Sequence, residues 1–263
     1  MFGMRRRRRE RLRRTPLEAE AWATIVRNVP YVGTLPAADR RELEGLVQIF
    51  LAEKRFEGCG GLLVMPEMKL TIAAQACVLL LRREADVYPG LSSILVYPHP
   101  YVARSRSVEA GIVTEGAVVR LGETWTRGSL VLSWDDVLQG AADPHDGHNV
   151  VFHEFAHQLD QQDGAADGTP PLASRSRYIA WARVLGAAYE DLVDRIHRHR
   201  PTLLDAYGAT NPAEFFAVAT ECYFEKPVAL ERRHPALYAE LCRFYRRDPA
   251  ALERGEQERE PPP

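Results

Sequence analysis

The sequence predicts an α+β fold in which a small, mixed or antiparallel sheet packs against helices. Helical periodicity fills both ends of the 263-residue chain, and short β-rich runs fill its middle. Hydrophobic residues make up 46% and charged residues 27%, which is ordinary for a globular protein with a sizeable core. The formal net charge of −2 gives no overall attraction to nucleic acid, so no specific nucleic-acid partner is expected.

Three helices are expected before the β-rich middle. The first covers 17–29 and ends before Pro30, because proline disfavours helical geometry at the residue before it. The second starts near 36–39 and repeats apolar residues at three- and four-residue spacing. The third, 67–82, is apolar on nearly all sides and is expected to be buried. Residues 17–90 are therefore interpreted as an N-terminal helical segment packed on the rest.

The middle of the chain predicts three to five strands. The runs 93–97 and 129–134 are rich in β-branched and aliphatic residues. The runs 111–114 and 117–121 flank Glu115-Gly116, which indicates a hairpin turn. Helices are then expected from 143 or 146 to about 162, and over 178–199, 211–224 and 235–246. Together these elements form a second predicted unit over 91–250.

Both ends of the chain are expected to be disordered. Residues 1–16 hold the arginine run Arg5 to Arg9, interpreted as a solvated arm or else as a weak anchor to nucleic acid or anionic lipid. Residues 251–263 are charged and rich in proline. No apolar stretch follows the basic N-terminal run, as a signal peptide would require. The longest apolar run, 70–81, is too short to span a membrane, so a cytoplasmic protein is expected. The four cysteines match no cysteine-rich zinc module.

The most specific motif is H-E-x-x-H at His153, Glu154 and His157. Residues four apart lie on the same face of a helix, so the two imidazoles can converge on one tetrahedral zinc ion. Glu154 lies beside the metal without binding it, where it can accept a proton from an activated water. The motif therefore predicts a metal centre with one Zn²⁺ per chain and a zinc-dependent peptidase of the gluzincin type.

A third protein ligand is needed, and the spacing leaves several candidates open. They are His145, His148, His197, His199, Glu214, Glu221 and Asp160. Asp160 and Asp163 occupy the positions where the metzincin pattern requires glycine and histidine, so that pattern is excluded.

Glu214 has two interpretations that spacing weighs about equally. It can bind the metal, or it can complete a capping box as the third residue after Asn211, with Pro212 at the first helical position. Glu221 lies two turns later on the same face. Glu221 and Asp160 are also candidates for holding an imidazole N–H from outside the metal.

Two segments resemble the Mlc titration factor A (MtfA) family of bacterial zinc peptidases. They are 153–160 (H-E-F-A-H-Q-L-D) and 205–218 (D-A-Y-G-A-T-N-P-A-E-F-F-A-V). Shorter stretches at 94–98, 130–134 and 242–245 are similar too, so the resemblance runs from about 17 to 249 and leaves out the arginine-rich arm. It implies a zincin-like catalytic domain similar to that of anthrax lethal factor.

The resemblance also implies residue roles and partners. It makes His153, His157 and Glu214 the zinc ligands, Glu154 the catalytic base and Tyr207 an active-site residue, whose phenol could stabilise an oxyanion. The expected partners are a peptide or protein substrate and, from the family's name, a transcriptional repressor of sugar uptake. Aminopeptidase activity is one expectation, and a repressor-binding module with residual peptidase activity is the alternative. An extended substrate could pair with a sheet edge, for which 129–134 is the candidate.

Overall fold

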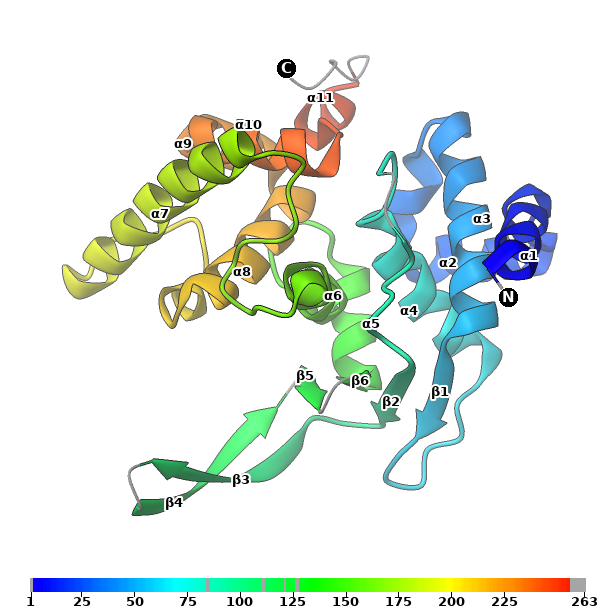
Figure 1. The fold of residues 1–263 in the computed structure, drawn as a ribbon, viewed down its shortest axis with the longest axis horizontal. Coiled ribbons are helices and arrows are strands. Elements are labelled where there is room, and N and C mark those ends of the chain that lie inside the picture. The colour runs from blue at the N-terminus through cyan, green and yellow to red at the C-terminus, as the bar shows by residue number, and fades with distance from the viewer. Residues whose placement is uncertain (1, 84–85, 110–111, 121, 126–127, 256–263) are drawn as a thin grey trace.

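The computed structural model describes residues 2–83, 86–109, 112–120, 122–125 and 128–255. Helices dominate, and they flank a small sheet and one central helix, α6 (Val150–Asp160), as Figure 1 shows. The helices before the sheet are α1 (Phe2–Arg14), α2 (Ala19–Asn28), α3 (Ala37–Glu53) and α4 (Pro66–Val78). The other helices after it are α5 (Trp134–Ala142), α7 (Arg175–His197), α8 (Pro212–Glu225), α9 (Pro227–Arg233), α10 (Pro235–Tyr245) and α11 (Pro249–Glu253). Three 3₁₀ turns are η1 (Pro30–Thr34), η2 (Gln161–Asp163) and η3 (Ala206–Ala209).

The main sheet has the strand order β1-β2-β6-β5. Strands β1 (Arg55–Gly58), β2 (Ser93–Tyr97) and β6 (Ser129–Ser133) run parallel, and β5 (Gly122–Trp125) runs antiparallel to β6 at the edge. Of the two predicted alternatives, the antiparallel sheet is therefore wrong, and the main sheet is mixed. Two strands of the main sheet, β1 and β5, were missing from the prediction. The β1 sequence Arg-Phe-Glu-Gly lacks a run of apolar residues. Its parallel pairing with β2 is possible because α4 supplies the crossover between them.

The predicted edge strand is also wrong, because β6 has β2 on one side and β5 on the other. Trp134 does not continue β6 but begins α5, whose first turn is capped by the Ser133 hydroxyl accepting from Asp136 N. This change from strand to helix places α5 directly before the helix that carries the histidine motif.

The predicted hairpin turn at Glu115-Gly116 is wrong. Strand β4 (Ile112–Arg120) passes through these residues without a break and pairs with β3 (Tyr101–Glu109). Gly116 lies opposite Ser105 in the register, so the glycine is an interior strand residue. The two strands form a separate ribbon that extends away from the main sheet in Figure 1.

The central helix α6 is fixed by aromatic packing on two sides. Its Val151, Phe152, Phe155 and Leu159 side chains are fully buried. The Phe155 ring packs edge-on against Tyr88, with 4.7 Å between ring centroids. On the other side, the Phe152 ring lies 5.1 Å from Phe224 of α8. The loop that carries Tyr88 and helix α8 therefore hold α6 in one orientation, which fixes where its polar side chains point.

The N-terminal arginine run is a helix packed on α3, which corrects the prediction of a disordered arm for residues 1–16. Gly45 of α3 allows the close approach, because a Cβ there would lie 2.9 Å from the Arg13 backbone. Arg9 donates two hydrogen bonds of 2.6 Å to Glu53, and Arg5 donates a third of 2.9 Å. Composition alone favoured disorder because it does not show that Leu12 packs inward and that Glu53 neutralises two arginines.

The docking of α1 should depend on the charge of Glu53. Hydrogen bonds from Arg9 lower the pKa of Glu53 to about 2. The stabilisation of docked α1 by charged Glu53 is therefore complete above the ordinary pKa of 4.5 and is lost as pH falls toward 2. We expect Glu53→Gln to speed tryptic cleavage within residues 5–14 by about tenfold, because α1 detaches more often. The exposed Glu57→Gln is the control. Equal cleavage rates in the two variants would contradict the docking role of Glu53.

The N-terminal segment and the catalytic region share one sheet, because β1 from residues 17–90 pairs with β2. The domain boundary near residue 90 stays a prediction. Residues 256–263 of the expected tail lie outside the described residues, and α11 occupies the start of that tail. Within the described part of the chain, no helix is long and apolar enough to cross a bilayer.

Candidate metal centre

The site begins with the residue that starts α6. Asn149 is the N-cap, and its side-chain oxygen accepts from Phe152 N at 3.0 Å. Its side-chain nitrogen donates to Gln75 Oε1 and to Gly140 O, both at 2.9 Å. This buried amide therefore fixes the first turn of α6 against α4 and α5, one turn before His153.

Three side chains converge in front of α6. The Nε2 atoms of His153 and His157 lie 3.3 Å apart. Oε2 of Glu214, from α8, lies 2.9 Å from the first nitrogen and 3.3 Å from the second. Within the described residues these three side chains make up the group able to hold a metal ion. The other candidate third ligands, His145, His148, His197 and His199, are not part of it.

The distances between these three atoms suit a small tetrahedral ion. Ligand atoms at about 2.0–2.1 Å from a tetrahedral zinc ion are about 3.3 Å from one another. The observed separations of 2.9, 3.3 and 3.3 Å are close to this value. Two imidazoles and one carboxylate leave a fourth position for water or substrate, so the donor set fits a catalytic zinc ion.

Glu214 belongs to the cap of α8 through its backbone and to the three-residue cluster through its side chain. Its backbone N–H donates to Asn211 Oδ1 at 3.0 Å, so Asn211 caps α8. The carboxylate does not return to Asn211 but points at the two imidazoles. Capping and side-chain placement therefore cooperate, because the cap fixes the backbone turn from which the carboxylate extends.

Glu221 supports the cluster from behind. Its Oε1 accepts from His153 Nδ1 at 2.7 Å, and its Oε2 accepts from the Asn149 backbone N–H at 2.6 Å. One buried carboxylate thus orients the His153 ring and holds the start of α6. Such a contact fixes which ring nitrogen is available to a metal.

The pKa values reflect this crowding of charges. Burial lowers the pKa of His153, but hydrogen bonds with Glu214 and Glu221 outweigh it and raise the pKa to about 10. Burial raises the pKa of Glu214, but hydrogen bonds with both imidazoles outweigh it and lower the pKa to about 2. Without a metal, His153 is therefore a charged imidazolium at neutral pH, with a proton on both ring nitrogens. Metal binding must release one of these protons and should weaken as pH falls.

Glu154 is buried next to the two histidines, and its surroundings indicate a role other than metal binding. It is 5% exposed, and burial raises the pKa of its carboxyl group, while the nearby imidazoles act in the opposite direction. A carboxylate whose pKa is raised by burial is suited to accept and release a proton. Glu154 is not part of the three-residue group that could hold the metal.

Tyr207 is an exposed residue next to the cluster. Its ring centroid is 5.9 Å from that of His153, and the residue is 55% exposed. It sits in η3, where Asp205 Oδ1 accepts from its backbone N–H at 2.7 Å. The capping role of Asp205 was missing from the prediction, although an aspartate directly before a turn is a recognisable cap signal. The turn thus places the Tyr207 ring beside the His153 ring.

Asp160, expected beside an imidazole, instead holds a loop. Its Oδ2 accepts from Gly168 N at 2.9 Å, and burial raises the pKa of Asp160 to about 6. Gly168 O accepts from Trp181 Nε1 at 2.9 Å. A Cβ on Gly168 would lie only 2.3 Å from Pro212 O, so this loop packs directly against the turn that precedes Glu214.

Gly168 should therefore matter for the metal site as well as for stability. We expect Gly168→Ala to lower the unfolding free energy by about 2 kcal/mol, because its φ of +78° is left-handed and the new methyl displaces Pro212. Metal affinity should fall by about tenfold as Glu214 moves. Gly164→Ala is the matched control, since it has a φ of +94° but no neighbour within 4 Å. Melting curves and metal competition check both effects, and equal changes in the two variants would refute the contact with Pro212.

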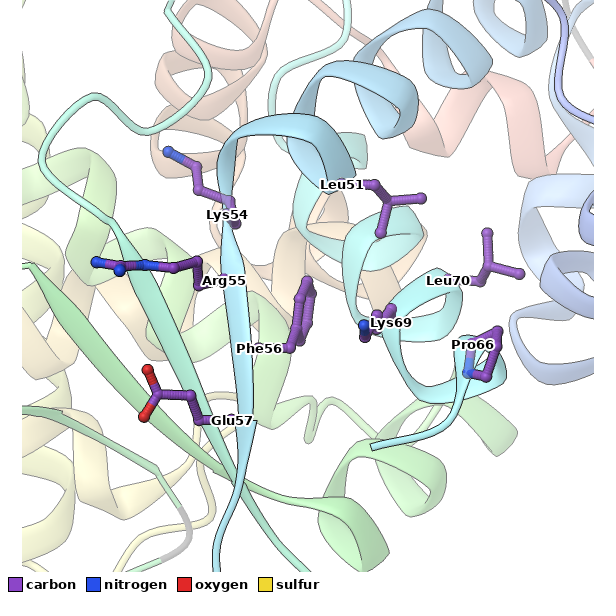
Figure 2. A pocket seen from close by; sticks show the side chains of 8 residues that line it. All are labelled: Leu51, Lys54, Arg55, Phe56, Glu57, Pro66, Lys69 and Leu70. Atoms are coloured by element: carbon purple, nitrogen blue, oxygen red, sulfur yellow. The ribbon is translucent and has the colours of Figure 1, made fainter. Parts of the chain in front are cut away.

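A separate pocket of about 530 Å³ lies beside β1, between the end of α3 and the start of α4 (Figure 2). Leu51, Phe56, Pro66 and Leu70 supply its apolar lining. Lys54 is part of its wall, and its ammonium donates to Tyr88 O and Leu91 O. None of the residues of the metal centre lines this pocket, so we do not include it in the candidate site.

Comparison with known proteins agrees with the geometry. Residues 4–246 match the family of glucose-regulated metallo-peptidases M90. The match includes most of α1, so the prediction that the resemblance leaves out the arginine-rich arm is wrong. The chain is 41% identical over 244 residues to the protein slr2042 of Synechocystis, covering 92% of this chain and 89% of that one. It is 36% identical over 228 residues to Mlc titration factor A of Yersinia pestis and of Yersinia pseudotuberculosis, covering 85% of this chain and 83% of each relative. The resemblance seen in the sequence is confirmed: the chain belongs to the M90 metallopeptidase family, the family of Mlc titration factor A.

Proposed function

We propose that this protein is a zinc-dependent peptidase of the gluzincin type, with His153, His157 and Glu214 as zinc ligands. The observation that carries the proposal is the convergence of three donor atoms, 2.9 to 3.3 Å apart, from two helices. The ligand set of two histidines and one glutamate is one that catalytic zinc sites use. When bound, zinc would supply Lewis acidity, which makes water more acidic and polarises a substrate carbonyl.

The chain's own side chains would then handle the protons. Glu154 would accept a proton from the attacking water and return it to the leaving nitrogen of the peptide. Its burial supports this, because a desolvated carboxylate binds a proton more readily. Glu221 would hold the His153 ring in place during the reaction through the 2.7 Å contact with Nδ1.

Tyr207 would donate its hydroxyl hydrogen to the oxygen that becomes negative in the transition state. We expect Tyr207→Phe to lower kcat by about a hundredfold, while KM and zinc content stay near wild type, because the ring beside His153 remains. Steady-state kinetics on the zinc-loaded protein check this. A wild-type kcat in the variant would remove Tyr207 from the mechanism.

The edge strand β5 would bind the substrate backbone in place of the strand first considered. It is the edge of the main sheet next to β6 and lies against α6. An extended peptide could add to this edge as a further strand, which would place its carbonyl groups near the metal centre.

A regulatory function is the second candidate, and it rests on the name that the Yersinia relatives carry, Mlc titration factor A. In this alternative the chain would bind a transcriptional repressor, and peptidase activity would be residual. The intact Glu154 favours the peptidase, because zinc binding alone does not require it.

Digestion of a mixed-sequence peptide library by the zinc-loaded protein tests the proposed function. Mass spectrometry of the products shows whether the cuts are at amino termini, as in an aminopeptidase, or internal. We expect defined cuts that Glu154→Gln abolishes. A library left intact by the zinc-loaded wild-type protein would favour the binding module.

A further inference from the structure

The docked helix α1 presents a dense arginine surface to solvent. It carries eight arginines and one glutamate, a formal charge of +7. The whole chain has a net charge of −2, so the remaining residues carry −9. The structure thus concentrates positive charge on one helix of an otherwise acidic chain. This helix lies at one end of the molecule in the view of Figure 1.

Only one face of α1 is used for docking. Arg5, Arg9 and Leu12 face the body, where they contact Glu53 and the core. With 3.6 residues per turn, Arg7, Arg11 and Arg14 lie on the opposite face, and all three are exposed. Arg6 and Arg13 lie on one flank and Arg8 on the other, and these are exposed too.

We propose that this arginine surface, made of Arg6, Arg7, Arg8, Arg11, Arg13 and Arg14, binds the phosphate backbone of duplex nucleic acid without sequence preference. All its cations are arginines, and guanidinium groups contact phosphate oxygens in a bidentate manner. Clustered like charges on one helix repel one another, and bound phosphates would relieve this repulsion. The interaction is separate from the peptidase site.

The geometry favours a duplex over an anionic membrane. The arginine surface covers the outer face and both flanks of a rod about 20 Å long, so it can reach the phosphate strands on either side of a groove. A flat bilayer would contact mainly the outer face. Among the described side chains of α1, Leu12 packs inward and Met4 is the one large apolar side chain that is exposed. The described part of this helix therefore offers no apolar face for membrane insertion.

Fluorescence anisotropy with a labelled DNA duplex of about 20 base pairs tests the proposal, with salt varied from about 50 to 200 mM. We expect the triple variant Arg7→Gln, Arg11→Gln, Arg14→Gln to weaken binding by about tenfold or more. The slope of log affinity against log salt concentration should become shallower by about three. The docking residues Arg5 and Arg9 are unchanged in it. Arginine-to-lysine substitutions at the same positions should keep most of the binding.

The matched control removes the same charge elsewhere, through Arg175→Gln, Arg183→Gln and Arg200→Gln in and after α7, where all three arginines are exposed. It should change the affinity by less than about twofold. Equal weakening in both triple variants would overturn the proposal. So would an absence of duplex binding at low salt, whether or not vesicles containing phosphatidylserine bind.

Discussion

Replacing Glu154 with glutamine should abolish peptide cleavage and leave zinc binding intact. We expect kcat to fall by about a thousandfold, because the amide cannot accept a proton from water or return it to the leaving nitrogen. Zinc content should remain at one ion per chain, since Glu154 is not among the three converging ligand atoms. Cleavage rates on a peptide that the wild-type protein cleaves, and metal analysis of the same preparation, check both halves of this expectation.

The matched control is Glu57→Gln, which changes an exposed glutamate on β1 by the same single atom. It should leave kcat within about twofold of wild type. Turnover of Glu154→Gln at the wild-type rate would rule out its role as the base. Loss of zinc in that variant would mean that Glu154 supports the metal rather than the proton transfer.

Replacing Glu214 with alanine should have the second largest effect, on zinc affinity. We expect a loss well beyond the 10- to 100-fold that is typical for residues outside the ligand sphere. The fold should survive, because Asn211 caps the Glu214 backbone N–H, which alanine retains. Competition with a fluorescent chelator measures the affinity, and circular dichroism measures the helix content.

Glu221→Ala is the informative comparison, because Glu221 touches His153 through Nδ1, the nitrogen away from the cluster. Its zinc affinity should fall less than that of Glu214→Ala. The same affinity in wild type and Glu214→Ala would remove Glu214 as a ligand. Unfolding of Glu214→Ala would instead make its carboxylate a structural group.

The sequence predicted which side chains come together in the site better than the contacts that hold them there. Local spacing places His153 and His157 on one face of a helix, and the structure has them there. The choice between capping and metal binding for Glu214 could not be made from spacing, because its backbone N–H joins the cap of α8 while its carboxylate points at the imidazoles. The loop contact of Asp160 with Gly168 depends on tertiary packing, which no local pattern contains.

The fold was predictable where periodicity is strong and not where pairing is non-local. Strand β2 begins and ends at the expected residues, and α10 lies within one residue of its expected range. The polar strand β1 joins the sheet only because β2 lies beside it, so its own sequence does not indicate a strand. Helix α1 likewise depends on Glu53 and Gly45, more than 30 residues away.

Zinc reconstitution of peptide cleavage tests the central claim most directly. The protein would be stripped of metal with a chelator, and cleavage of a peptide would be followed as zinc is added back. We expect no cleavage by the stripped protein and full recovery at one equivalent of zinc per chain. Cleavage by the stripped protein at the untreated rate, or no recovery on adding zinc to a folded chain, would contradict a zinc-dependent peptidase.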